Sequence, residues 1–269
     1  MGLFLVTMNL VDTHCHLTHE RFKEDIDDVI NRAKKAGFKA LVCSGTNPPT
    51  NREIIALAKR YPIIKPSLGI YPIDALGLAP DEVGMARHDG KIDIDAEFEF
   101  FNQHKNEIVS IGEVGMDFYW TDKHNEQQKK NFEKIIKLTE KIGKPIVVHT
   151  RRAEEECVAL LEKSQLNYVV LHSFEARKNL IKRAADRGFY FSVPTSVVRS
   201  QQFQTLVEIV PLTQIFTETD APWLSPFKDK RNESVFIVES IKKIAEIKKI
   251  SEDDVAAQVW KNYEKVFST

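Results

Sequence analysis

Eight short runs of apolar and β-branched residues recur along the 269-residue chain, each followed by a longer segment with the apolar spacing of a helix. This alternation restricts the fold most, because parallel strands need a crossover connection that is usually helical. Several runs, such as the one around Val147, are apolar throughout, which is typical of strands covered by helices on both faces. The runs expected to form strands are 10–14, 40–44, 63–69, 108–112, 145–149, 168–172, 189–193 and 214–217.

Eight strand–helix units in this length favour an α/β fold made of one closed (β/α)8 TIM barrel, which typically takes about 250 residues. An open doubly wound sheet is the alternative, but no G-x-G-x-x-G motif follows the first run. No repeat or Pro/Gly/Ser linker divides the chain, so a single domain over 1–269 is expected. Residues 70–93 predict a long βα loop, a helix is expected from about Glu233, and an extra C-terminal helix begins at Ser251.

The charge balance is nearly neutral, with 38 basic and 39 acidic side chains and a net charge of −1. No global positive field therefore draws the protein to nucleic acid or to anionic lipid, and any phosphate site must be local. Three scattered cysteines do not make a disulfide framework and favour a reducing, cytoplasmic location. The apolar stretch Gly2 to Met8 is too short to span a membrane and lacks a basic flank, so we expect no membrane association; nothing indicates an obligate protein partner.

Polar residues of one chemical kind stand at the ends of five of the eight runs. In a barrel the carboxyl ends of all strands meet at one rim, which is where barrel enzymes place their active sites. Every one of these side chains is of a type that binds divalent metals. The candidate metal ligands are His14, His16, Glu113, His149, His172 and Asp220.

The spacing of His14 and His16 puts both imidazoles on one face of a strand, where they can share a cation. Histidine and carboxylate ligands suit Zn, Mg or Mn, and six ligands match two ions bridged by a carboxylate better than one. Each residue also has an ordinary structural interpretation: Glu113 could pair with Arg151, and Asp220 could begin a turn. The agreement of ligand types with the barrel rim favours the metal site.

Longer blocks of sequence around these residues occur in a fixed order at 12–17, 69–72, 112–119, 148–151, 171–174, 217–224 and 262–267. Together they resemble the TatD family of metal-dependent deoxyribonucleases, in the amidohydrolase superfamily. The resemblance covers nearly the whole chain and implies a barrel with two divalent ions. It implies that one ion is held by His14 and His16 and the other by His149 and His172, with Glu113 bridging them and Asp220 both a ligand and a proton carrier.

The activity that the resemblance implies is phosphodiester hydrolysis by a metal-activated water, as a 3′–5′ exonuclease on DNA ends or single strands. Asp220 and Glu113 are the candidate catalytic residues, with Asp220 accepting the water proton. Arg151 is the candidate phosphate clamp, and its alternative is an ion pair with Glu113 or Asp117. Tyr71 stands where the family usually shows histidine; we expect it to contact a base or phosphate of the substrate, or else to anchor its loop.

Two other functions remain open from the sequence. A small-molecule lactonase, amidase or deaminase would suit the same superfamily, although the two-metal branch of that kind bridges its ions with a carboxylated lysine where this chain has Glu113. A non-catalytic metal-binding barrel would need a closed coordination shell. DNA or another phosphoester is thus the expected partner, and the choice among Zn, Mg and Mn is left open.

Overall fold

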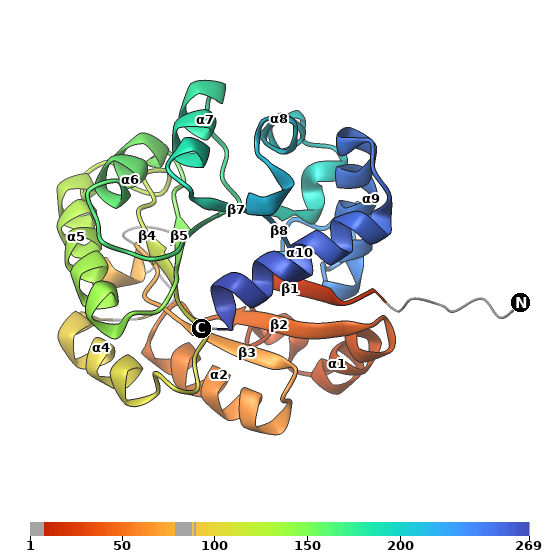
Figure 1. The fold of residues 1–269 in the computed structure, drawn as a ribbon. Coiled ribbons are helices and arrows are strands. Elements are labelled where there is room, and N and C mark those ends of the chain that lie inside the picture. The colour runs from red at the N-terminus through yellow and green to blue at the C-terminus, as the bar shows by residue number, and fades with distance from the viewer. Residues whose placement is uncertain (1–7, 79–87, 89, 269) are drawn as a thin grey trace, which may run out of the picture.

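The structure, a computed structural model, describes residues 8–78, 88 and 90–268, which form a barrel of parallel strands inside a ring of helices (Figure 1). Each strand pairs in parallel with the next one along the chain, in the order β1 to β8. The predicted (β/α)8 barrel is confirmed, and each of the eight runs overlaps one strand. The strands are β1 (Leu10–Cys15), β2 (Phe38–Ser44), β3 (Ile64–Leu68), β4 (Ser110–Gly115), β5 (Ile146–His149), β6 (Val169–His172), β7 (Tyr190–Pro194) and β8 (Ile215–Glu218).

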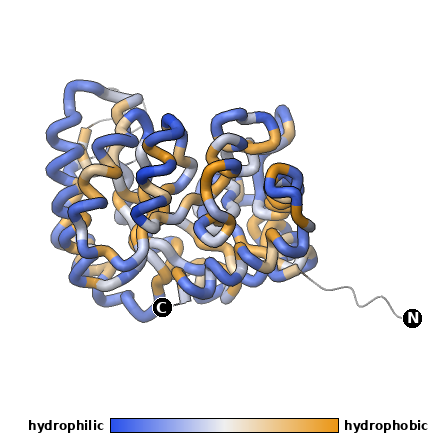
Figure 2. Tube along the Cα trace, turned by 45° about the horizontal axis from the view of Figure 1, so that its top comes forward, coloured by the Kyte–Doolittle hydropathy of each residue, from blue (hydrophilic) through white to orange (hydrophobic). Residues whose placement is uncertain are grey.

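The helices are amphipathic and cover the outer face of the strands. In α1, for example, Val29, Ile30 and Ala33 are buried while the charged side chains between them face water. Figure 2 shows the resulting alternation of hydrophobic and hydrophilic stretches along the helices. The described α-helices are α1 (Ile26–Lys35), α2 (Pro48–Arg60), α4 (Ile94–Gln103), α5 (Asn125–Ile142), α6 (Glu154–Leu161), α7 (Lys178–Asp186), α8 (Gln201–Ile209), α9 (Ile237–Lys248) and α10 (Glu252–Phe267).

Helix starts follow local sequence signals. Asn47 and Thr50 form a reciprocal capping box at α2, whose first residue is a proline. Ser251 caps α10, as predicted, by accepting a hydrogen bond from the Asp254 N–H. The helix expected from about Glu233 begins instead as the 3-10 turn Ser234–Phe236, which continues into α9.

The barrel closes between β1 and β8, where side chains supply much of the bonding. The Thr13 hydroxyl donates to the Thr217 carbonyl at 3.1 Å, and the Thr217 hydroxyl donates to the Val11 carbonyl at 3.0 Å. One parallel bridge, Cys15 with Ala221, continues this seam toward the carboxyl ends of the strands. The seam therefore holds the β1 and β8 ends side by side, which places their side chains at one site.

The end of α10 lies at the amino-terminal side of β8, far along the strand from that rim. The Asn262 amide donates to the carbonyls of Leu212 and Ile215, each at 2.8 Å, and Phe267 packs on Phe216. In Figure 1 the same helix crosses the end of the barrel that faces the viewer. The extra C-terminal helix thus stabilises the end of the barrel opposite the candidate site.

Two sequence expectations fall partly outside the described residues. Positions 79–87 and 89 of the expected loop 70–93 are outside, and so is the apolar stretch that begins at Gly2, up to residue 7. Within the described part of the chain, no helix combines the length and the apolar character needed to cross a bilayer.

Candidate metal centre and active site

The six predicted metal ligands converge at the carboxyl-terminal rim of the barrel, although they come from five strands or the residues that follow them. All of them except the buried His14 border a cavity of about 480 Å³. His14 is fully buried, and the side chains of Glu113 and Asp220 are 5% and 18% exposed. The sequence therefore brings together a buried cluster of imidazoles and carboxylates that opens to solvent on one side.

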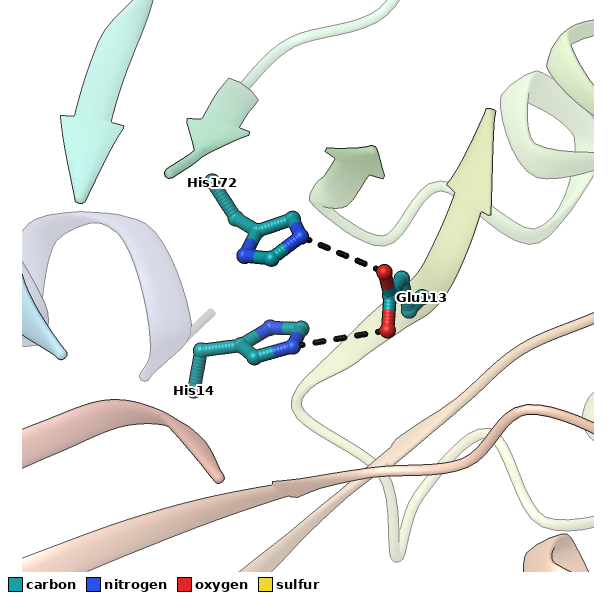
Figure 3. A group of neighbouring side chains, drawn as sticks. All are labelled: His14, Glu113 and His172. Carbon is teal, nitrogen blue, oxygen red and sulfur yellow. Dashed lines mark ion pairs between the residues drawn. The ribbon is translucent and has the colours of Figure 1, made fainter. Parts of the chain in front are cut away.

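Glu113 lies at the centre of the cluster and divides its two oxygens between two pairs of histidines. Its Oε2 atom is 3.5 Å from His14 Nε2 and 3.4 Å from His16 Nε2. Its Oε1 atom is 2.8 Å from His149 Nδ1 and 3.2 Å from His172 Nε2. Figure 3 shows the stacked rings of His14 and His172, each of which faces a different oxygen of Glu113. This is the arrangement that a carboxylate bridge between two cations requires.

Asp220 completes the first group of ligand atoms. Its Oδ1 atom is 3.3 Å from His16 Nε2 and 3.7 Å from His14 Nε2, and the two Nε2 atoms are 3.1 Å apart. Bonds of about 2.0–2.1 Å in a tetrahedral zinc site separate the ligand atoms by about 3.3 Å. The spacing of the His14, His16 and Asp220 atoms therefore fits one divalent ion, with Glu113 Oε2 within 3.5 Å of both histidine nitrogens.

The second group offers three ligand atoms. His149 Nδ1 and His172 Nε2 are 3.2 Å apart, and both face Glu113 Oε1. Three protein ligands with one position left for water or substrate are characteristic of catalytic metal sites, whereas structural sites are closed. The donor set thus fits a second ion with an open position toward the cavity.

A further layer of side chains orients the histidines from behind. Asp117 Oδ2 is 2.8 Å from His149 Nε2, and Glu218 Oε1 is 3.5 Å from His172 Nδ1. Ser44 serves the other pair, with its hydroxyl 3.2 Å from His14 Nδ1 and its carbonyl 3.0 Å from His16 Nδ1. Partners of this kind fix the tautomer and the ring orientation of metal-binding histidines. His14, His16 and His149 therefore each have one nitrogen hydrogen-bonded to the protein and the other directed at the centre, while His172 has Glu218 only at ion-pair distance behind it.

The charge state of the metal-free site follows from this packing. Burial opposes ionisation of Glu113, but the charge of His172 and hydrogen bonds from the surrounding histidines hold its pKa well below its usual value. Burial likewise opposes protonation of His149, but bonds to Asp117 and Glu113 outweigh it and raise its pKa to about 9. The pKa of His172 is also raised, against its burial, by Glu218 and Glu113. The positive charges of the protonated His149 and His172 therefore compensate the negative charges of the buried carboxylates around them.

The other side of the centre behaves differently. Burial and the nearby charge of His172 lower the pKa of His14, which favours a neutral imidazole ready to bind metal. Burial would raise the pKa of Asp220, but a hydrogen bond from His16 and the histidine charges lower it. Asp220 is therefore a carboxylate at neutral pH.

Two glycines permit the close packing around Glu113. A Cβ atom on Gly69 would lie 2.3 Å from the Glu113 backbone nitrogen, and one on Gly115 would lie 2.0 Å from the His149 carbonyl oxygen. Gly115 also has a φ of 141°, which side chains rarely adopt. Asp220 and Ser173 adopt the left-handed conformation with φ of 55° and 46°, a strain that is frequent at functional sites.

The two predicted substrate contacts border the same cavity but differ in their surroundings. Arg151 is exposed and makes no ion pair with Glu113, Asp117 or another described residue; its guanidinium lies 3.6 Å from the centroid of the Tyr119 ring. Tyr71 is buried, and its hydroxyl donates to Asp117 Oδ2 at 2.6 Å. The phenol therefore supports the ligand shell, a contact that sequence reasoning did not foresee.

Several residues of the site were missed at the sequence level. They include the outer partners Ser44, Asp117 and Glu218 and the aromatic residues Trp120 and Trp223, which line the cavity. A signal existed for some: Ser44 ends a strand at the same rim, and Glu218 precedes Asp220 by two residues. Only the structure shows that Glu218 faces His172 whereas Asp220 faces His16.

Comparison with known proteins shows the family of the chain. The profile of the family described as TatD related DNase matches residues 11–268. A human protein named deoxyribonuclease TATDN3 is 36% identical over 265 residues, covering 97% of this chain and 95% of the relative. The 3′-5′ ssDNA/RNA exonuclease TatD of Salmonella typhimurium is 29% identical over 247 residues, covering 88% of this chain and 90% of the relative.

Among solved structures, the TatD homologue YJJV of Escherichia coli superposes with a TM-score of 0.84 at 22% identity, covering 97% of this chain and 98% of the other. That likeness shows the fold. The family profile and the human relative span the six candidate ligands at the rim, and the chain belongs to the TatD-related DNase family.

Proposed function

We propose that this protein is a metal-dependent deoxyribonuclease that hydrolyses phosphodiester bonds at DNA ends or in single strands, with 3′–5′ polarity. The proposal rests mainly on the two carboxylate oxygens of Glu113, which face two different pairs of histidines. Two cations bridged by a carboxylate suit phosphodiester hydrolysis. The names of the human and Salmonella relatives support the choice of nucleic acid as substrate.

The proposed site holds two divalent ions, of zinc, magnesium or manganese. His14, His16 and Asp220 would hold one ion, His149 and His172 the other, and Glu113 would bridge them. When bound, such ions supply positive charge at the phosphoryl group and make water a better nucleophile at neutral pH. The proposal also places the protein in the cytoplasm as one domain over 1–269, which its three buried, unpaired cysteines support.

The residues of the chain have distinct tasks in this reaction. Asp220 directs Oδ1 at the histidines, and its second oxygen is left to accept a proton from the attacking water. Asp220 is ionised at neutral pH, as a general base must be. Glu113 stays ionised as well and fixes the separation of the two histidine pairs. Arg151, exposed at the mouth of the cavity, would clamp a phosphate with its planar fork.

The deciding experiment is hydrolysis of a single-stranded DNA oligonucleotide by chelated protein to which Zn, Mg or Mn is added back. We expect EDTA to abolish hydrolysis, and at least one metal to restore it in the wild type but not in Glu113→Ala. A lactone and a cyclic amide are assayed under the same metal. Hydrolysis of either in place of DNA, or stoichiometric metal without hydrolysis of any substrate, would reject the nuclease proposal.

A further inference from the structure

A group of cationic and aromatic side chains lies beside the metal centre without being part of it. The Tyr119 ring, 42% exposed, has the guanidinium of Arg151 at 3.6 Å and that of Arg152 at 4.7 Å from its centroid. Cations stack on aromatic rings because the ring face is negative. One tyrosine thus gathers two cations that follow β5, next to the ligand His149.

These two cations lack a matching anion. Neither guanidinium lies within ion-pair distance of a carboxylate in the described part of the chain; Glu175 influences Arg151 only at longer range. Like charges gathered on one ring repel each other, and a bound anion relieves that repulsion. Arg152 also adopts the left-handed conformation, with φ of 57°, a strain found mostly at functional positions.

Trp120 adds a donor that has no acceptor. Its indole Nε1 is buried and has no hydrogen-bond partner among the described residues, and the side chain lines the cavity together with Arg151. A buried N–H without a partner is uncommon in folded proteins and calls for an explanation, such as a bound ligand that accepts from it. Arg151 and Trp120 thus border a site whose substrate is proposed to be anionic, and the Tyr119 ring holds Arg152 next to Arg151.

We propose that Tyr119, Trp120, Arg151 and Arg152 form a second phosphate subsite, which binds the phosphate next to the scissile one in a single-stranded nucleic acid. The inference rests on the proposed nuclease function and extends it to substrate length. The arginines contact the phosphate, and Tyr119 is a positioning residue that holds both of them. A single strand fits because the cavity of about 480 Å³ has the size of a small-ligand pocket, too small for a duplex.

Binding tests the subsite without relying on turnover. The probe is a fluorescein-labelled phosphorothioate octathymidylate, which resists hydrolysis, titrated by anisotropy with metal-loaded protein at several salt concentrations. We expect Arg151→Ala to weaken binding about tenfold, since charge-assisted hydrogen bonds are the strong ones. The slope of log K against log salt should become shallower by about 0.7, because the variant neutralises one phosphate fewer.

Tyr119→Ala should weaken binding about two- to fivefold, the size of a cation–π contribution, and Tyr119→Phe should restore most of the affinity because it keeps the ring. The matched control is Phe227→Ala. Phe227 is 39% exposed and carries Lys230 at 5.2 Å, but Lys230 does not line the cavity, whereas Arg151 on the Tyr119 ring does. Binding unchanged in Arg151→Ala and Tyr119→Ala, or equally tight binding of a duplex, would overturn the subsite.

Kinetics then separates this inference from the nuclease proposal. Wild-type kcat/KM is compared for the dinucleotide TpT, with one phosphate, and the trinucleotide TpTpT, with two. We expect the trinucleotide to be preferred, and Tyr119→Ala to reduce the preference through KM rather than kcat. If the wild type cleaves neither substrate, the nuclease proposal fails while the binding results still judge the subsite. If both are cleaved and the variants keep the wild-type preference, only the subsite is wrong.

Discussion

The hydroxyl of Tyr71 and the Nε2 atom of His149 meet on the same oxygen, Asp117 Oδ2, at 2.6 Å and 2.8 Å. His149 in turn directs Nδ1 at Glu113 Oε1. Tyr71 therefore lies three contacts from the centre of the site and acts on it through a carboxylate. The sequence predicts a direct contact with substrate or a loop anchor; Tyr71 borders the cavity, and its hydroxyl donates to Asp117, so we also expect it to support His149.

Replacing Tyr71 by phenylalanine removes this hydroxyl and keeps the ring against His149. We expect the affinity for the ion proposed at His149 and His172 to fall by up to about tenfold, the lower end of the effect of outer partners of metal ligands. Competition with a chromogenic chelator measures this affinity. Tyr61→Phe is the matched control, because Tyr61 also donates to an aspartate, Asp27, but far from the site.

A different result would give Tyr71 a different role. If Tyr71→Phe keeps wild-type metal affinity and loses kcat, then the hydroxyl acts on the substrate, and its bond to Asp117 is secondary. If Tyr71→Phe and Tyr61→Phe both leave metal affinity and kcat unchanged, support of His149 by the phenol is rejected.

Asp220→Asn separates metal binding from proton transfer. The amide oxygen can still face His14 and His16, but an amide cannot accept the proton from water. We expect the ion held by His149 and His172 to remain and kcat to fall by about 10²- to 10⁴-fold, the range for a general base. Metal analysis and kcat are measured on the same preparation, with Asp229→Asn, an exposed carboxylate on the following loop, as control. A kcat near the wild-type value would assign the proton to another group.

Metal binding should depend on pH through the second histidine pair. His149 has a pKa of about 9 in the metal-free protein, and the pKa of His172 is raised as well, so both carry protons at pH 7. Only neutral imidazole binds metal, so uptake must displace these protons, and affinity should rise from pH 7 to about pH 9. The pKa of His14 is lowered, so His14 releases no proton on binding at neutral pH.

Calorimetry in two buffers of different ionisation enthalpy counts the protons that are released. We expect proton release at pH 7 that falls as the pH passes through about 9, where His149 loses its proton. Release that is absent at pH 7, or constant over this range, would contradict protonated His149 and His172 in the metal-free protein.

The fold was largely predictable because each strand is a continuous apolar run and each helix has one apolar face. The boundaries of the strands were less predictable. Strand β4 was expected to end before Glu113 but continues to Gly115, because Val114 and Gly115 pair with Val148 and His149 of β5. Such pairing depends on the neighbouring strand, which the local sequence pattern does not contain.

The candidate ligands were predictable because the ends of parallel strands meet at one rim, whatever the details of packing. The side chains that contact the histidines from behind were not predictable in this way. Glu218 and Asp220 are two residues apart, yet Glu218 is fully buried behind His172 while Asp220 borders the cavity. The bend after β8, with Asp220 in the left-handed conformation, separates their environments, and no periodicity in the sequence indicates it.

The seam between β1 and β8 offers a last test, of stability. Thr217→Val keeps the shape of the side chain but removes the hydroxyl that donates to the Val11 carbonyl. We expect the free energy of unfolding to fall by about 1 kcal/mol, the usual contribution of one buried hydrogen bond. Urea unfolding measures it, with an unchanged slope against denaturant showing that the folded state is as compact as before.

Thr139→Val is the matched control for this test. Thr139 is as buried as Thr217, but its hydroxyl donates to the Ile135 carbonyl one turn back within α5, so the bond joins no separate elements. Removing it should cost less than removing that of Thr217, because the backbone of α5 holds that turn without the hydroxyl. Adding Thr13→Val to Thr217→Val removes both hydroxyl bonds of the seam and should raise the cost to about 2 kcal/mol. Equal costs at Thr139 and Thr217 would mean that the two hydroxyls contribute to closure of the barrel no more than any other buried threonine.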